Sequence, residues 1–318
     1  MVDKAPEQSD VVRVPRFANI NPFMRATYQE DPSGLDVAML GVPFDLGSSF
    51  RAGARHGPAQ VREMSRMIRQ VHYPSMLEPF KACRIADVGD APVNPLDLDE
   101  SLASIETFVA RIHAAGALPL AVGGDHTITL PILRAIAKDG PLALIQIDAH
   151  SDTLDEMMGK KYANGTPIRR AIEEGSLDPN RVVQVGLRGS LFQASDLSWA
   201  KDVGIRIIDM EEVCEMGLPK TIEEMRDVVQ DNPVYLTFDI DAIDPAYAPG
   251  AGGLEPGGFT SREAQTLLRG LSGLHLVGAD LNEVSPPLDP TGNTAMLASQ
   301  LLFEQLCLLV ESIRADQK

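Results

Sequence analysis

The sequence contains few cysteines, and their pattern argues against two kinds of protein. Three cysteines are spread over 318 residues, and no Cys-x-x-Cys pair occurs. Such spacing is unsuited to a disulfide scaffold or to a thiolate metal site, and it is typical of buried thiols in a reducing compartment. We therefore expect a cytoplasmic protein with unpaired thiols at Cys83, Cys214 and Cys307.

Long apolar runs and an excess of positive charge are also missing. No stretch of 18 apolar residues occurs, and the N-terminal sequence MVDKAPEQSDVVRVPRF lacks the apolar segment of a secretory signal. The formal net charge is −17 at pH 7. An acidic surface repels phosphate backbones and anionic lipids, so we expect neither nucleic acid nor a membrane among the partners.

Hydrophobic residues make up 44% of the chain, which is enough to build the core of one large domain. Short apolar runs rich in β-branched residues alternate with helical patterns. The predicted strands are Val37–Val42, Arg84–Val88, Leu118–Val122, Leu142–Ile147, Val182–Leu187, Ile205–Ile208, Val234–Phe238 and Leu274–Ala279. The predicted helices are Leu98–Ala115, Thr127–Lys138, Ser261–Leu271 and Thr294–Arg314.

This alternation predicts an α/β fold with a mostly parallel central sheet that is covered by helices on both faces. We find no internal repeat and no linker, so we expect a single domain over residues 1–318 with an N-terminal arm of about residues 1–34. In such sheets, ligands bind at the carboxyl ends of the strands.

Polar side chains follow four of the predicted strands at those ends. The sequences after them are Gly123-Gly124-Asp125-His126, Asp148-Ala149-His150-Ser151-Asp152, Asp239-Ile240-Asp241 and the segment from Asp280 to Glu283. Alternate residues of an extended chain share one face, so ligands spaced by two residues converge on one site. Four crowded aspartates repel one another unless cations lie between them, and two divalent ions would balance their charge.

We therefore predict a centre of two metal ions. Its ligands are His126, Asp148, His150, Asp152, Asp239 and Asp241. Mixed carboxylate and imidazole ligation suits Mn²⁺, and also Zn²⁺, Co²⁺, Ni²⁺ or Fe²⁺. A single Asp-x-His-x-Asp segment could equally be a loop of capping residues, and a lone histidine is more often structural. The presence of all three clusters at strand ends favours the metal site.

The chain resembles the ureohydrolase family, which includes arginase, agmatinase and the guanidino-acid hydrolases. The motifs that carry the resemblance are SFRAGARHGPAQVR at Ser49–Arg62, GGDHT around His126, DAHSD at Asp148–Asp152, TFDIDAIDPAYAPG at Thr237–Gly250 and EVSPP at Glu283–Pro287. The segments PRFANINPFMR and GDAPVNPLDLDESL look closest to guanidinobutyrase and guanidinopropionase. The resemblance runs from about Val14 to Glu311.

The resemblance implies a three-layer α/β/α arginase-type fold, assembled as a homotrimer or homohexamer, with two Mn²⁺ ions or, as the alternative, Ni²⁺. It places His126, Asp148, Asp152 and Asp239 around the first ion, and Asp148, His150, Asp239 and Asp241 around the second. It also implies the reaction, in which an activated water attacks a guanidinium carbon and urea and an amine are released. Asp152 would hydrogen-bond the nucleophile, and Glu283 would pair with the guanidinium.

The sequence departs from the family pattern at two places. Asn164 replaces the histidine of a usual His-Gly-Thr-Pro segment, a histidine assigned as the proton shuttle to the leaving amine. An asparagine cannot titrate near neutral pH. The usual Gly-Thr-Gly-Thr-Pro-Glu segment reads Gly-Ala-Gly-Gly-Leu-Glu at 250–255. In the loop Thr153–Ala163, the predicted substrate contacts are Asp155, Met157, Met158 and Tyr162.

These departures leave several functions open. The first is hydrolysis of a guanidino acid such as 4-guanidinobutyrate or 3-guanidinopropionate. The alternatives are hydrolysis of agmatine or of an atypical guanidine or biguanide, and a weakly active metal-bound subunit in a hetero-oligomer with a paralogue. A deacylase of the histone-deacetylase type is disfavoured, because such sites usually hold one zinc ion and this chain offers ligands for two.

Overall fold

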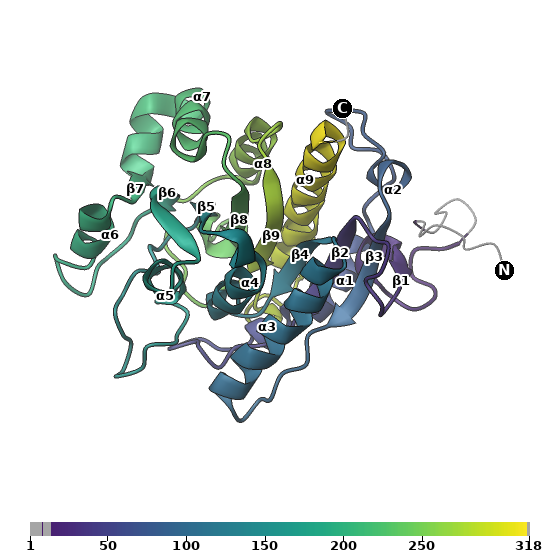
Figure 1. Cartoon of the computed structure of the whole chain (residues 1–318), viewed down its shortest axis with the longest axis horizontal. Helices are drawn as coiled ribbons and strands as arrows, with labels where there is room; N and C mark the ends of the chain where they lie inside the picture. The colour runs from purple at the N-terminus through teal and green to yellow at the C-terminus, as the bar shows by residue number, and fades with distance from the viewer. Residues whose placement is uncertain (1–7, 9–13, 317–318) are drawn as a thin grey trace.

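The computed structural model describes residue 8 and residues 14–316, and its described strands form one parallel sheet (Figure 1). The strand order is β1-β3-β2-β4-β9-β8-β5-β6-β7. The strands are β1 (Thr27–Tyr28), β2 (Val37–Val42), β3 (Ile85–Asp90), β4 (Leu118–Gly123), β5 (Leu142–Ile147), β6 (Leu177–Leu187), β7 (Arg206–Asp209), β8 (Val234–Asp239) and β9 (Leu276–Asn282). Each neighbouring pair is parallel.

Helices cover both faces of the sheet and give the protein three layers. The helices are α1 (Gly57–Ser65), α2 (Pro79–Ala82), α3 (Leu98–Ala114), α4 (Thr129–Ile136), α5 (Pro167–Glu173), α6 (Ser198–Val203), α7 (Met210–Val229), α8 (Ser261–Gly270) and α9 (Asn293–Asp316). Helices α1, α7, α8 and α9 share one apolar core with the sheet, and α3, α4, α5 and α6 share the other. The predicted three-layer α/β/α arrangement is confirmed.

Local sequence signals explain where the predicted helices begin. The Asp97 side chain accepts a hydrogen bond from the Glu100 backbone at the start of α3. A reciprocal pair of hydrogen bonds between Thr260 and Glu263 forms a capping box at the start of α8. Each side chain satisfies backbone N–H groups that have no partner within the helix.

The structure differs from the predicted bounds at several elements, and β9 extends to Asn282, so that Asp280 lies within the strand that it was predicted to follow. Strand β6 begins at Leu177 and is longer than predicted. The predicted helix Thr127–Lys138 is an α-helix only over α4, because tight 3₁₀ turns at His126–Ile128 and Ala137–Asp139 flank it. Strand β1 lies inside the predicted N-terminal arm and pairs with β3, so part of that arm extends the sheet.

One described helix, α9, is long and apolar enough by composition to cross a membrane. However, 78% of its most apolar window is buried inside the protein, where it packs against α1, α8 and β9. Burial of this kind is what the central helix of a globular core requires.

The strand order brings the four predicted ligand segments together. Strands β4, β9, β8 and β5 are consecutive in the sheet, and these are the strands that end in the polar sequences. Their carboxyl ends therefore meet at one edge, as Figure 1 shows for the middle of the sheet. Each strand is buried and mostly apolar, and the polar residues lie in its last positions or directly after it.

Candidate metal centre

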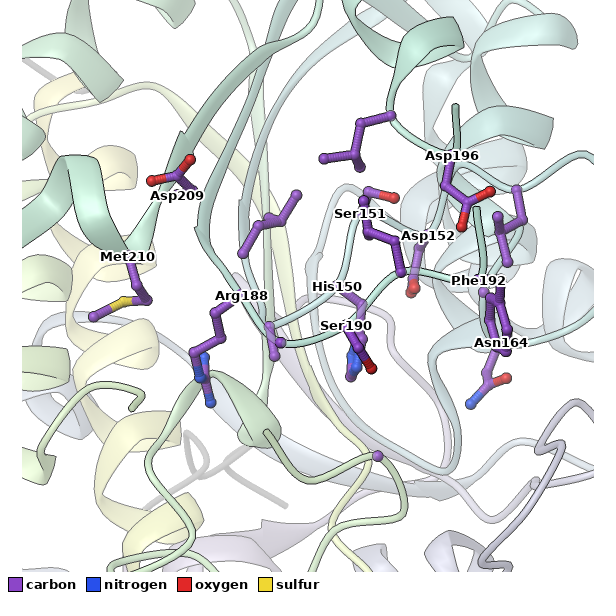
Figure 2. Close-up of a pocket in the computed structure, with 18 of the residues that line it drawn as sticks. His150, Ser151, Asp152, Asn164, Arg188, Ser190, Phe192, Asp196, Asp209 and Met210 are labelled. Atoms are coloured by element: carbon purple, nitrogen blue, oxygen red, sulfur yellow. The ribbon is translucent and has the colours of Figure 1, made fainter. Parts of the chain in front are cut away.

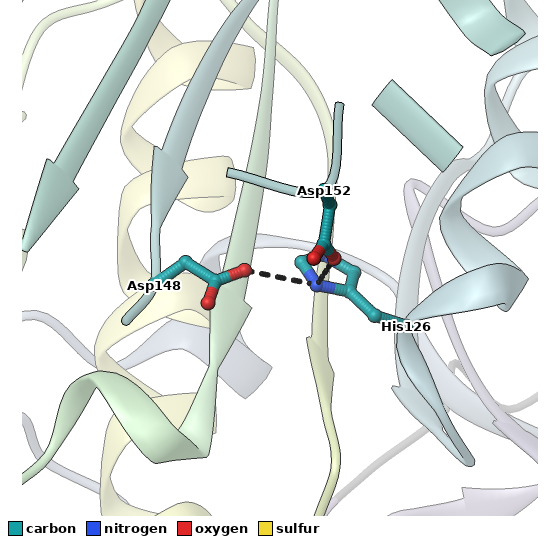
Figure 3. A group of neighbouring side chains, drawn as sticks. All are labelled: His126, Asp148 and Asp152. Carbon is teal, nitrogen blue, oxygen red and sulfur yellow. Dashed lines mark ion pairs between the residues drawn. The ribbon is translucent and has the colours of Figure 1, made fainter. Parts of the chain in front are cut away.

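His126 and three aspartates form the first half of the polar cluster. The His126 Nδ1 atom lies 3.0 Å from Asp148 Oδ2, 2.8 Å from Asp152 Oδ2 and 3.4 Å from Asp239 Oδ2. Figure 3 shows the carboxylates of Asp148 and Asp152 converging on the histidine ring. All four side chains are buried, so solvent cannot screen their charges.

His150 and two aspartates form the second half. The His150 Nδ1 atom lies 3.1 Å from Asp241 Oδ2 and 3.6 Å from Asp148 Oδ1. Asp148 thus presents one oxygen to each histidine, and it belongs to both groups of side chains that could hold a metal ion. The structure brings all six predicted ligands to one place, with Asp148 between the two halves.

A chain of hydrogen bonds fixes the orientation of the His126 ring. The Thr237 hydroxyl lies 2.9 Å from His126 Nε2 and donates to Asp280 Oδ1, 2.7 Å away. The single hydroxyl proton of Thr237 is used on Asp280, so Thr237 accepts the proton of Nε2. In the neutral ring, this tautomer leaves the lone pair of Nδ1 facing three carboxylates.

The buried Nδ1 atom of His126 makes no hydrogen bond among the described residues. A lone pair aimed at three carboxylate oxygens is repelled unless a proton or a metal cation lies between them. The donor set of imidazole nitrogens and carboxylate oxygens therefore fits a divalent metal ion.

Hydrogen bonds from neighbouring backbone and side-chain groups orient the aspartates. The His150 N–H donates to Asp148 Oδ1, and the Asp241 N–H donates to Asp239 Oδ1, at 2.7 and 2.8 Å. The Gln146 amide donates to Asp148 Oδ2 at 2.7 Å. These bonds orient the carboxylates before any ligand binds, which preserves the geometry of the cluster.

The pKa shifts in the cluster are consistent with a site for a metal ion. Burial and the charge of Asp148 raise the pKa of Asp152 to about 6, and burial and the charge of Asp241 raise the pKa of Asp239 well above its ordinary value. Burial opposes the charged form of His126, but the carboxylates of Asp152, Asp148 and Asp239 together outweigh it and raise the pKa of the ring. The carboxylates therefore attract positive charge, which a protonated histidine or a metal ion can supply.

Glu283 and Asn164 lie beside the cluster. Glu283 Oε1 accepts hydrogen bonds from the His126 backbone N–H at 2.9 Å and from Asn164 Nδ2 at 3.3 Å. Burial and the charge of Asp125 raise the pKa of Glu283 to about 8. Its backbone has a φ of 61°, and that of Asp152 has a φ of 53°, conformations that cost energy outside glycine and are concentrated at functional sites.

A cavity of about 520 Å³ opens over the cluster. Figure 2 shows His150, Asp152, Asn164, Phe192 and Asp196 on its wall. The volume falls within the range of small-molecule sites, about 300–1,000 Å³. The cavity therefore gives a small substrate access to the candidate metal ligands.

The four predicted substrate contacts lie in different surroundings. Met157 lines the cavity, whereas Asp155, Met158 and Tyr162 are not among its lining residues. Asp155 is half-exposed and forms ion pairs with Lys161, Arg169 and Arg170. Met158 points to solvent, with 85% of its surface exposed. Tyr162 packs under Arg134, whose guanidinium lies 5.4 Å from the ring centre.

Sequence reasoning missed Thr237 and Arg188. Thr237 precedes a ligand pair within a strand, and its inward direction follows from alternation with Phe238. Arg188 directly follows β6 and lines the cavity, so the rule that polar residues follow strands could have found it. Its guanidinium donates to the backbone carbonyl groups of Gly186, Asp241 and Glu255, so it holds the loop beside the cluster.

The comparisons with known proteins agree with this geometry. The model of the family described as "Arginase family" matches residues 35–307. The chain belongs to the arginase family. It is 52% identical to a guanidinopropionase of Pseudomonas aeruginosa, and the alignment covers 98% of each chain. It is 47% identical to a guanidinobutyrase of the same organism, with coverage of 95% of this chain and 96% of the relative.

A solved structure supports the same assignment for this arginase-family chain. The proclavaminate amidino hydrolase from Streptomyces clavuligerus superposes with a TM-score of 0.91 at 38% identity, covering 94% of this chain and all of that one. The predicted family, the arginase-type fold and the class of enzyme, a ureohydrolase, are confirmed. Divalent-metal binding is consistent with the two groups of ligands.

Proposed function

We propose that this arginase-family chain hydrolyses a guanidino acid such as 3-guanidinopropionate or 4-guanidinobutyrate to urea and an amino acid. The substrate class rests on the full-length similarity to a guanidinopropionase and a guanidinobutyrase. The reaction rests on the cluster itself. The observation that carries it is the buried His126 Nδ1 atom, which lies within 3.4 Å of three aspartates, next to the cavity that Glu283 adjoins.

The residues that would hold the metals are the six of the cluster. His126, Asp148, Asp152 and Asp239 would surround the first ion, and Asp148, His150, Asp239 and Asp241 the second. Two bound divalent ions would supply a water that is acidic enough to act as a nucleophile near neutral pH. A strong nucleophile is needed because three nitrogens donate electrons to the guanidinium carbon and make it a poor electrophile.

Glu283 would hold the substrate. Its carboxylate is buried, and a guanidinium ion can pair with both of its oxygens. The cationic substrate also favours the ionised form of Glu283, whose pKa is otherwise raised to about 8. The pairing would fix the plane of the guanidinium against the cluster, which is the orientation that attack requires.

Asp152 would transfer the protons of the attacking water. It lines the cavity, and its carboxylate would accept a proton from the attacking water and return it. Both water protons end on the leaving amine, which departs as an ammonium ion, and the water oxygen becomes the carbonyl oxygen of urea. Asn164 cannot transfer a proton in this way.

The metal is proposed to be Mn²⁺, with Ni²⁺ as the alternative. Four carboxylates and two imidazoles suit either ion, and Mn²⁺ has the stronger preference for oxygen ligands.

We also propose a cytoplasmic location and a homotrimer or homohexamer. Light scattering on the eluted peak of a sizing column tests the assembly, and a mass other than three or six chains contradicts it.

The decisive experiment measures urea release from the purified chain after metal removal and reloading with Mn²⁺ or Ni²⁺. We expect turnover of at least one guanidino acid, and agmatine serves as the comparison substrate. The Glu283→Gln variant should bind the same amount of metal and lose activity. Two bound metals without turnover on any guanidine would contradict the proposal.

A second function is favoured by one observation. Asn164 stands where the family carries a shuttle histidine, so the chain could serve as a weakly active subunit beside an active paralogue. In that case the chain alone would bind two metals and release little urea, and activity would appear when the paralogue is added. The same urea assay therefore separates the two proposals.

A further inference from the structure

Two loops, residues 153–166 and residues 189–197, form a large part of the cavity wall. Leu154 and Asn164 of the first loop line the cavity, and so does Phe192 of the second. Figure 2 shows Asn164 and Phe192 among the lining side chains. Neither loop contains a helix or a strand. Each loop therefore depends on contacts with neighbouring elements for its position.

The second loop is attached through α6. Among the described residues, the hydrogen bonds made by residues 190–197 lead only to this loop itself and to α6. The last of them joins the Leu197 carbonyl to the Lys201 N–H of α6. Helix α6 has only six residues, and a helix of that length has little stability of its own. The position of the second loop is thus set by the contacts that fix α6.

One of these contacts is made by Trp199, which lies in α6 two residues after the cavity-lining Leu197. The Arg169 guanidinium of α5 covers the Trp199 ring, with its carbon atom 4.6 Å from the ring centre. A guanidinium over an indole face is attracted to it, and more strongly where solvent is partly excluded. The Arg169 side chain is mostly buried, with 19% of its surface exposed. Arg169 therefore ties α6 and the second loop to α5.

The same guanidinium faces Asp155 of the first loop. Arg169 Nη2 lies 3.6 Å from Asp155 Oδ1, which also accepts hydrogen bonds from Arg170 and Lys161 at 2.9 and 3.0 Å. These hydrogen bonds lower the pKa of Asp155 to about 2, so the carboxylate stays charged at neutral pH. Asp155 directly follows the cavity-lining Leu154, so these cations hold the first loop against α5.

We propose that Arg169 couples the two loops, through Asp155 on one side and Trp199 on the other, and so positions both parts of the cavity wall around the substrate. Arg169 is a positioning residue, because it is not among the residues that line the cavity. Its backbone N–H donates to the Asp152 carbonyl, so α5 is itself fixed to the metal cluster. The effect on substrate binding rests on the proposed ureohydrolase function, whereas the coupling of the loops does not.

The first test uses Trp199 as a reporter, since it is the single tryptophan of the chain. Quenching of its fluorescence by acrylamide measures the access of solvent to the ring. Asp155→Ala changes the other loop and should raise the quenching constant by up to about fivefold, the factor that the loss of one exposed ion pair can give. The control is Glu173→Gln, which removes an ion pair of Arg169 within α5 and should leave the constant unchanged.

The second test is a double-mutant cycle on KM for 3-guanidinopropionate. Asp155→Ala and Trp199→Leu should each raise KM by up to about fivefold, with kcat and metal content unchanged, because the substrate must then order a loose loop. Both variants act through one guanidinium, so the double variant should raise KM no more than the larger single effect. Trp199→Phe keeps an aromatic face and should restore most of the wild-type KM.

The outcomes separate the coupling from the function on which its effect rests. Equal quenching constants in the wild type and Asp155→Ala overturn the coupling, whatever the activity. A double variant whose KM change is the product of the two single changes overturns the positioning role and leaves the ureohydrolase function intact. If Trp199→Leu does not fold, Arg169→Gln takes its place in the cycle and gives the same comparison. Absence of turnover on every guanidine contradicts the proposed function, and the quenching constants then decide the coupling alone.

Discussion

Asn164 donates a hydrogen bond from its side-chain nitrogen to Glu283 Oε1, 3.3 Å away, while its own Oδ1 atom is buried without a hydrogen-bond partner among the described residues. The amide must face the carboxylate with its nitrogen, because two oxygens would repel each other. The amide oxygen is then available to a donor in the cavity, and a guanidinium N–H is such a donor. Asn164 is thus placed to orient Glu283 and the substrate.

The Asn164→Ala variant should bind substrate less well. Loss of a hydrogen bond to a charged group costs about 1.5–3 kcal/mol, which corresponds to a rise in KM of roughly 10- to 150-fold. Steady-state kinetics on the guanidino acid with the highest kcat/KM measures this rise in KM. A large fall in kcat with an unchanged KM would contradict an orienting role and would favour a role in the chemical step.

The Asn164→His variant tests the proton path. If the asparagine limits the reaction on guanidino acids, the histidine should raise kcat and add a pH dependence near its ordinary pKa of about 6.5. If Asn164 serves an unusual substrate, the exchange should lower kcat/KM on that substrate. The pH profile of kcat distinguishes the two results, since Asn164 itself has no charge to lose.

Asp148 is the shared carboxylate of the two histidine groups, so its removal should affect both metals. We expect the Asp148→Asn variant to bind fewer than one metal per chain, because the amide carries no charge and each ion loses a ligand. Elemental analysis after dialysis gives the stoichiometry. The matched control is Asp155→Asn, on a half-exposed aspartate outside the cavity lining, which should keep the wild-type metal content.

Thr237 links His126 to Asp280, so its hydroxyl should support metal affinity. The Thr237→Val variant keeps the shape of the side chain and leaves His126 Nε2 and Asp280 Oδ1 each without this partner. Loss of such an outer partner typically lowers metal affinity by about 10- to 100-fold. Competition with a chelator measures the metal affinity of each variant. Thr237→Ser keeps the hydroxyl and should behave like the wild type, and equal losses in both variants would point to packing as the cause.

The sequence was sufficient to predict most of the sheet and the grouping of the six candidate ligands, because both depend on local patterns. Apolar runs that end in Asp148 and Asp239 indicate buried parallel strands. The carboxyl ends of parallel strands lie together at one edge of the sheet. The alternation rule also placed His150 and Asp241 near the cluster without any knowledge of the strand order.

The substrate contacts were less predictable, because loop residues have no periodic pattern. The ion pairs of Asp155 and the stacking of Tyr162 on Arg134 depend on where α4 and α5 lie in space. The short strand β1 has only two residues, which is too few for a periodicity to be seen. The link from Thr237 to Asp280 crosses from β8 to β9, and neighbouring strands cannot be known before the sheet order is.

The metal-free protein should lose stability as the pH rises from about 4 to 8. The pKa of Asp152 is raised to about 6 and that of Glu283 to about 8, in both cases chiefly by burial. A carboxyl group whose pKa is higher in the folded chain binds more protons there than in the unfolded chain. Its stabilising contribution is therefore complete below the unfolded value, near 4, and is lost as the pH rises through the folded value.

The other groups of the cluster act in the same direction or outside this range. The pKa of His126 is raised by its carboxylate neighbours, so above about pH 6.5 it too binds more protons in the folded chain. The lowered pKa of Asp148, whose burial is outweighed by hydrogen bonds from the histidines, affects stability only at pH values below its unfolded value. Bound metal ions neutralise the carboxylates at every pH at which they stay bound, so the loaded protein should show a flatter dependence.

Thermal unfolding of the chelator-treated and metal-loaded proteins between pH 5 and pH 8.5 tests this relationship. The midpoint of the metal-free protein should fall across the range, and the gap to the loaded protein should widen as the pH rises. The Glu283→Gln variant lacks one titrating group, so its metal-free curve should be flatter between pH 6 and pH 8. Parallel curves for the metal-free and loaded proteins would mean that the cluster does not hold the metals, because ions bound elsewhere leave these carboxylates to repel one another.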